Sequence, residues 1–303
     1  MTRSVPEAVL PATSPAEVLA ARPSKVVAFW RAFRKKPLGL FGLIVLVVVV
    51  AVALTAPLVA PYGRDESVNL FFQSPTWAHP FGTDHLGRDV FSRVIYGASV
   101  SLQVGVAAVA LGTLVGTAAG VVSGYFGRWV DISLQRVIDV LMALPGILLA
   151  LTIAAALGAS QRNVTIAIAI ALLPASARVA RGSTLSVKER QYVEAAHALG
   201  AGHVRIMLRH VLPNIMAPLI VIVSVQLGVA IIAEASLSYL GLGVPINVPT
   251  WGNMLSGAAL SYMTKAPWMA IFPGVALTLV VLGINALGDA LRDLLDPRMR
   301  GTQ

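Results

Sequence analysis

Long apolar stretches without a charged residue recur along this chain of 303 residues. About 20 helical residues cross the hydrocarbon core of a bilayer, and each stretch is near that length. Only 12% of the residues are charged, against about 25% in soluble domains. We therefore predict an all-α integral membrane protein with six transmembrane helices. The predicted spans are residues 38–60, about 98–124, 140–161, about 163–180, 211–233 and 266–288.

The basic residues predict the orientation of these spans. With the N-terminus inside, the inner segments hold 18 of the 23 Lys and Arg residues and the outer segments hold 5. Because inner loops carry the excess of Lys and Arg, both termini should be cytoplasmic. The excess base then faces anionic lipid of the plasma membrane, so a nucleic-acid partner need not be invoked.

The spans divide the chain into five predicted regions. They are a cytoplasmic tail with a basic interfacial segment (1–37), the first span (38–60), an outer loop (61–97), a core with five spans (98–291), and a cytoplasmic C-terminal tail (292–303). The first apolar run is longer than a signal peptide's and starts only after Lys36, which favours a retained anchor. The uncharged stretch 235–264 is rich in Gly, Pro, Asn and Ser, and we expect an outer loop there, with a re-entrant segment as the alternative.

Residues 194–213 read EAAHALGAGHVRIMLRHVLP and form a polar, basic segment between two apolar runs. The small side chains of Ala195 and Ala196 allow another protein to approach closely. Gly200 can adopt a positive φ and turn the chain between two short helices, and Pro213 ends the segment. The pattern predicts a docking site for a soluble cytoplasmic partner. The alternative is an ordinary amphipathic loop.

The loop between the first two spans contains HPFGTDHLGRDVFSRVIYG, residues 79–97. Gly82 and Gly87 are turn residues, and Asp84 or Asp89 could cap a helix. Two His and an Asp here raise the alternative of a metal site, but capping and hydrogen bonding are favoured. We predict no metal.

Small residues and prolines also mark the spans. Gly105, Gly112, Gly116 and Gly120 form a stripe in the second span, which favours close helix packing over a substrate groove. Pro145 and Pro174 fall inside apolar runs and predict kinks.

Several activities find no support in the sequence. The chain has no cysteine, which excludes disulfides and thiolate chemistry. It also lacks a Gly-rich phosphate loop, an H-E-x-x-H motif and a nucleophile elbow, so it has no visible means of hydrolysing ATP. An intramembrane enzyme would need paired groups within the spans, and Asp139 and Asp289 lie at span ends.

Glu234 is the one ionisable residue that stands clearly at membrane depth, since it follows a long uncharged run. Three interpretations remain open. It lines the pathway and attracts a cationic group, it has a structural role as a hydrogen-bonding partner, or it lies high enough to reach outer water.

Four blocks of sequence, taken together, resemble one family. They are HPFGTDHLGRDVFSR (79–93), YVEAAHALGAGHVRIMLRHVLPN (192–214), EASLSYLGLGVPINVPTWGNML (234–255) and PWMAIFPGVALTLVVLGINALGDALRDLLDPR (267–298). The chain is similar, from about residue 38 to 298, to the second membrane subunit of ATP-binding-cassette importers for dipeptides, oligopeptides and nickel. It departs from the family pattern at 244–249, where a more Pro-rich run is expected.

The resemblance implies a type I importer permease that is not itself an enzyme. Its partners would be a homologous second permease, two cytoplasmic ATPase subunits or a fused ATPase, an extracytoplasmic substrate-binding protein and the lipid bilayer. The chain would bind no cofactor, since ATP and Mg²⁺ are used by the ATPases. A nickel or other small-solute importer is one alternative, and an ion-coupled secondary transporter is another.

The resemblance also implies roles for two groups of residues. The EAA loop, residues 188–213, would couple to the ATPases through Glu194, Ala195, Ala196, Gly200, Arg205, Leu212 and Pro213. The outer-loop signature would comprise Gly82, Thr83, Asp84, Gly87, Arg88 and Asp89.

Overall fold

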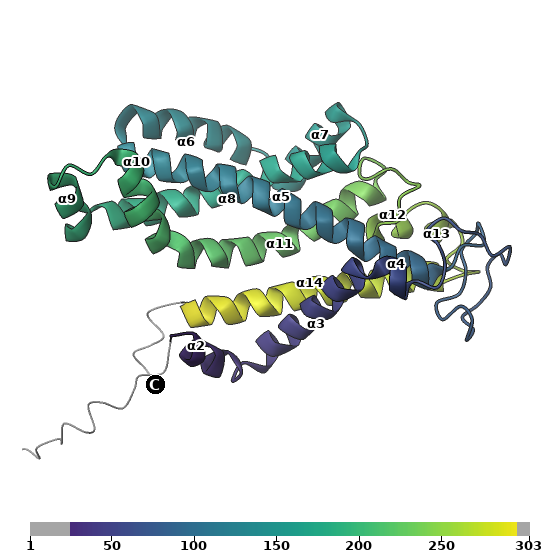
Figure 1. Ribbon diagram of the computed structural model, residues 1–303. Helices are drawn as coiled ribbons and strands as arrows, with labels where there is room; N and C mark the ends of the chain where they lie inside the picture. The colour runs from purple at the N-terminus through teal and green to yellow at the C-terminus, as the bar shows by residue number, and fades with distance from the viewer. Residues whose placement is uncertain (1–24, 296–303) are drawn as a thin grey trace, which may run out of the picture.

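The computed structural model describes residues 25–295, and the regular elements in that range are helices (Figure 1). Extended pairing there is limited to two isolated bridges in the loop before the second long helix. The all-α prediction is confirmed. The predictions for the N-terminal tail before residue 25 and for the chain after residue 295 lie outside the described residues.

The helices follow the order of the apolar stretches. They are α2 (Lys25–Phe33), α3 (Pro37–Leu54), α4 (Ala56–Val59), α5 (Val90–Phe126), α6 (Arg128–Met142), α7 (Gly146–Leu157), α8 (Gln161–Lys188), α9 (Gln191–Ala198), α10 (His203–Ile206), a π-helical turn η1 (Met207–Val211), a 3₁₀ turn η2 (Leu212–Ile215), α11 (Met216–Tyr239), α12 (Trp251–Leu255), α13 (Ala258–Ser261) and α14 (Trp268–Leu295).

Within residues 25–295, five helical segments are long and apolar enough to cross a membrane, and the pair α6 and α7 makes a sixth if it is one span. That pair is bent by 87°. The kink predicted at Pro145 is therefore present, but it breaks the third span into two helices. Pro145 has no N–H and disfavours helical backbone in the residue before it, so the helix ends at Met142 and restarts at Gly146.

Other span boundaries also differ from the prediction: α3 ends at Leu54, before residue 60, and α14 continues to Leu295, beyond residue 288. α5 begins at Val90, well before residue 98, because the Asp89 side chain caps it by accepting from Ser92 N–H. α8 continues through Pro174 to Lys188, beyond the predicted end near residue 180. Charged residues that the sequence places in loops thus belong to the long helices.

Three glycines of the stripe in α5 pack directly on the backbone of α8, whereas Gly105 faces Ile231 of α11. A Cβ at Gly112 would lie 2.6 Å from Ala169 O, and one at Gly116 would lie 2.5 Å from Leu173 O. Gly120 faces Ala177 O in the same way, one turn further along. This confirms that the stripe serves helix packing, because any side chain there would push the two helices apart.

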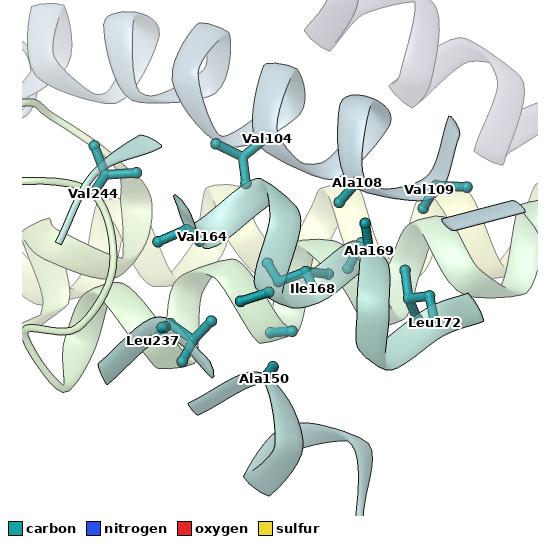
Figure 2. Packing of buried hydrophobic residues seen from close by; sticks show 14 residues of the cluster. Val104, Ala108, Val109, Ala150, Val164, Ile168, Ala169, Leu172, Leu237 and Val244 are labelled. Carbon is teal, nitrogen blue, oxygen red and sulfur yellow. The ribbon is translucent and has the colours of Figure 1, made fainter. Parts of the chain in front are cut away.

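The central core lies where α5, α7, α8 and α11 meet (Figure 2). Val104 and Ala108 of α5, Ile168 of α8 and Ala150 of α7 are all buried in it. Most of its members are Val and Ala, so helix axes approach closely and small displacements of one helix are passed to its neighbours.

The small helices mark the two ends of the bundle. Figure 1 shows α9 and α10 at one end, on the same side as α2 and the C-terminal end of α14. We call this the α9 end. The loop 60–89, α12 and α13 lie toward the opposite end, which we call the α13 end.

Candidate functional site

The turn at Gly200 ends α9 with two hydrogen bonds that define a Schellman motif. Gly200 N–H donates to His197 O at 2.9 Å, and Ala201 N–H donates to Ala196 O at 3.0 Å. Gly200 has φ +81°, the left-handed conformation that glycine adopts without strain. The predicted reversal between two short helices is present, and its geometry depends on this residue.

Apolar anchors fix the docking segment, residues 188–213, to the long helices. Val193 of α9 and Ile206 of α10 are buried in one cluster with Val121 of α5 and Val187 of α8. Val211, at the end of η1, is buried in the same cluster. Because interiors are close-packed, a force applied to α9 or α10 would move α5, α8 and α11 with it.

A polar contact adds to these anchors. The Tyr125 hydroxyl lies 2.9 Å from His203 Nδ1, and Phe126 and His197 also make ring contacts with His203. This cluster was not predicted from the sequence, since Tyr125 lies at the end of the second span, far in sequence from the docking segment.

The outward side of the same segment carries unpaired apolar side chains. Leu199 is 88% exposed, Val204 is 64% exposed, and Tyr192 and Leu208 are exposed beside them. Among the predicted residues, Glu194, Ala195 and Arg205 are exposed and Ala196 is half-buried. A polar helical segment with apolar residues turned outward has the composition of a protein-docking surface.

The chain leaves this segment through irregular helix. The π-helical turn η1 is followed by the 3₁₀ turn η2, which contains Leu212 and Pro213. Pro213 has no N–H to donate to the preceding turn, so the regular α-helical ladder cannot continue through it. A π-turn of this kind is common at functional sites, and here it joins the docking segment to α11.

The predicted outer-loop residues form a compact, hydrogen-bonded loop at the α13 end. Asp84 Oδ1 accepts from Leu86 N–H at 2.8 Å and from Arg88 N–H at 2.9 Å, while Arg88 Nε donates to Asp84 Oδ2 at 2.7 Å. The Thr83 hydroxyl donates to Leu70 O. Both Gly82 and Gly87 have φ +70°. These residues shape the loop by hydrogen bonding, as the sequence favoured.

Asp89, the second aspartate of the motif, joins this loop to α5. Asp89 caps α5 and is also 2.9 Å from His79 Nδ1, and both side chains are buried. His85 borders a cavity of about 420 Å³ with Arg88 and Arg93, and burial lowers the pKa of His85 while the Asp84 charge opposes that shift. No group of three His, Asp or Glu within residues 25–295 could hold a metal ion.

Aromatic and aliphatic side chains are also exposed at this end. Trp77 is fully exposed, and Phe71, Leu70 and Ile246 are exposed as well. Exposed Trp is a common anchor in protein interfaces.

Glu234 is 0% exposed and fully hydrogen-bonded within the chain. Its Oε2 accepts from the Ser101 hydroxyl and its Oε1 from the Ser238 hydroxyl, both at 2.8 Å. The interpretation in which Glu234 reaches outer water does not fit this burial. The contacts agree with a structural role that ties α11 to α5.

Three further polar groups within the bundle were not identified from the sequence. Gln226 of α11 bonds to Thr113, Ser176 and Leu172 O, linking three helices. Asp131 of α6 pairs with Arg181 of α8, and Asp139 of α6 lies 2.9 Å from Arg178 of α8. Asp139 therefore lies inside the broken third span and not at its end. The reason is that α6 begins at Arg128, well before the apolar run that starts at residue 140.

Most of the chain matches known protein families and curated relatives. Residues 88–301 match the family described as binding-protein-dependent transport system inner membrane component, and residues 26–75 match the N-terminal TM domain of oligopeptide transport permease C. The dipeptide transport system permease protein DppC of Alkalihalophilus pseudofirmus is 42% identical over 273 residues, 89% of each chain. The glutathione transport system permease protein GsiD of Escherichia coli is 43% identical over 275 residues, 90% of each chain.

Proposed function

The chain belongs to the family of binding-protein-dependent transport system inner membrane components, and we propose that it is one half of a peptide pathway driven by ATPases bound at the α9 end. The names of the relatives and the fold both support transport into the cell across a plasma membrane. The chain supplies the moving pathway and its partner subunits supply the chemistry.

The observation that carries this proposal is the docking segment, residues 188–213. Its outer side presents Leu199 and Val204 to a partner, while its inner side is locked into the spans through Val193 and Ile206. Such a two-sided element passes a partner's motion to the bundle. Closure of an ATPase dimer would thus rock α5, α8 and α11 as a rigid body.

The orientation follows from the same proposal. The α9 end would be cytoplasmic, where ATP is available, and the α13 end would face outward. The distribution of Lys and Arg supports that orientation. An extracytoplasmic binding protein would then meet the exposed Trp77 and Phe71 on the outer loop.

A homologous second permease would complete the pathway, as the family assignment supports. The named relatives transport a dipeptide and glutathione, which supports peptides over nickel as the substrate. An ion-coupled secondary transporter finds less support, since that class has no need for a docking segment of this kind.

The absence of cysteine allows a direct test of the orientation. Single Cys residues at the exposed positions Ser74 and Ser261 should react with an impermeant thiol reagent from outside. A Cys at the exposed Ser186 should react only after permeabilisation. Labelling of Ser186→Cys from outside would refute the proposal, because no ATPase could reach the docking segment.

The substrate is tested by transport. The full complex, purified from its native membrane with its binding protein, should take up a labelled dipeptide into proteoliposomes in an ATP-dependent way. Uptake of Ni²⁺ with no peptide uptake would favour the small-solute alternative. Uptake that follows an ion gradient without ATP would refute the importer assignment.

A further inference from the structure

The break in the third span exposes irregular backbone at membrane depth. Residues 142–148, which contain the break, are exposed throughout. Gly146 and Ile147 border the same pocket as Leu172 of α8, so the break lies beside that part of α8. Irregular backbone at such depth is found only where protein covers it or where it lines a water-filled cavity. The face of the bundle that carries the break is therefore not turned to lipid.

The depth of α8 can be bounded from its length. Its 28 residues extend about 42 Å, and the hydrocarbon core is about 30 Å thick, or about 20 helical residues. Residues 161–181 lie in the core if the first end is at the membrane surface, and residues 168–188 do so if the last end is. Leu172 and Arg178 fall inside the core in both cases.

An exposed ion pair lies at this depth. Arg178 Nη2 is 2.9 Å from Asp139 Oδ1, and the two side chains are 52% and 51% exposed. Both border a hollow of about 480 Å³ together with Gln135, Arg181 and Gly182. Charged side chains within a membrane face water or protein, so this hollow is not a lipid surface either.

An apolar pocket lies on the same face of α8. Its volume is about 400 Å³, and its lining includes Ile168, Ala171 and Leu172 of α8 with Ile147 of α7 and Val229 of α11. Positions 168, 171, 178 and 182 follow one another at helical spacing, so they belong to one side of the helix. Arg178 is about 10 Å along the axis from Ala171.

We propose that this face lines the water-filled pathway and holds a peptide in transit, with a charged end at Asp139 and Arg178 and an apolar side chain in the pocket beside Leu172 and Val229. The inference rests on the proposed function and names the surface that performs it. A peptide is a zwitterion with side chains, and this face offers a carboxylate, a guanidinium and an apolar hollow within the length of a few residues.

Water access is tested with single cysteines in the assembled complex. Val229→Cys and Ile147→Cys should react with a charged, water-soluble thiol reagent in one state of the ATP cycle, and a transported peptide should slow that reaction. Val47→Cys is the matched control, because Val47 is an exposed apolar residue near the middle of α3. It should react only with a lipid-soluble reagent. Reaction of Val229→Cys and Ile147→Cys only with the lipid-soluble reagent would overturn the proposal.

The charged end is tested by transport. Arg178→Gln should lower peptide uptake by roughly tenfold, the loss expected for one charge-assisted hydrogen bond. The matched control is the pair of Lys36 and Asp293, which are 2.8 Å apart and exposed to 41% and 46%. Neutralising that pair with Lys36→Gln should leave uptake unchanged.

A charge swap separates peptide binding from a structural role. The double variant Asp139→Arg with Arg178→Asp restores an ion pair but exchanges the positions of the two charges. Restored assembly without restored uptake is expected. Full recovery of uptake would show that the pair only holds α6 to α8. Since thiol reactivity needs no transported peptide, water access can be shown even if the substrate assignment fails.

Discussion

The Tyr125 hydroxyl lies 2.9 Å from His203 Nδ1, and this contact joins the end of α5 to the first residue of α10. It links a transmembrane helix directly to the proposed docking segment. The buried anchors Val193 and Ile206 make the same connection by packing.

Replacing Tyr125 with Phe tests that polar link. The ring contacts remain, but the hydrogen bond is lost, at a cost of about 0.5–1.5 kcal/mol and less where water reaches the site. We expect the ATPases to stay bound while peptide stimulates hydrolysis less strongly. Tyr262→Phe is the control, since Tyr262 is exposed at the α13 end and makes ring contacts with Phe72 and His85. Equal behaviour of the two variants would contradict a role for the link.

The Gly200 turn predicts a sharp difference between two nearby glycines. Gly200 and Gly202 both have open space where a Cβ would lie, but only Gly200 has a positive φ. Gly200→Val should cost about 1–2 kcal/mol, because an L-residue is strained in the left-handed region. Gly200→Ala should show the same strain in milder form, and Gly202→Ala should be nearly neutral. The measurement is coupled transport by complexes with normal membrane insertion. Wild-type transport by Gly200→Val would show that the turn is not the coupling element.

The close contact between α5 and α8 predicts different effects for substitutions at two further glycines, Gly120 and Gly182. A Cβ at Gly120 would collide with Ala177 O, whereas nothing lies within 4 Å of a Cβ at Gly182. Gly120→Val should separate the two helices and lower the thermal midpoint of the purified complex. Gly182→Ala should not lower it, because Ala is the better helix former and has open space there. If Gly120→Val melts like the wild type, the close backbone approach is not needed for stability.

Glu234 should tolerate loss of charge better than loss of hydrogen bonding. Gln can still pair with the Ser101 and Ser238 hydroxyls, so Glu234→Gln should keep assembly and most transport. Glu234→Leu removes the acceptors for both hydroxyls and should destabilise the chain by about 1–3 kcal/mol. Thermal unfolding and uptake measure the two effects. A Gln variant that assembles normally but loses uptake of a cationic peptide would favour the pathway interpretation.

Apolar periodicity and turn chemistry predicted the helical class and several local features. Each span can be recognised from a single charge-free apolar run, and the sequence contains one such run for each predicted span. Gly200 and Gly82 were predicted as turn residues because glycine tolerates positive φ, and both have it. Asp89 was one of two candidate caps and is the one that caps α5.

The boundaries and the polar pairs could not be predicted, because partners distant in sequence determine them. Arg178 lies within α8, where it pairs with Asp139 of α6. From the sequence alone, a charge at the end of an apolar run marks a loop. The burial of Glu234 likewise depends on Ser101 of α5, and no periodicity within α11 indicates that partner.

Docking of an ATPase on the exposed residues of the segment 188–213 should be prevented by a charge placed among them. Leu199→Asp and Val204→Asp should leave the anchors Val193 and Ile206 intact, since both altered side chains point away from the cluster. Ile246→Asp, at an exposed apolar position on the α13 end, is the control.

The measurement is the amount of ATPase that copurifies with the permease pair. We expect the Leu199→Asp and Val204→Asp variants to lose the ATPase and ATP-driven uptake, while the Ile246→Asp variant retains the ATPase. A Leu199→Asp, Val204→Asp double variant that retains a full complement of ATPase and transports peptide at the wild-type rate would contradict docking at this segment.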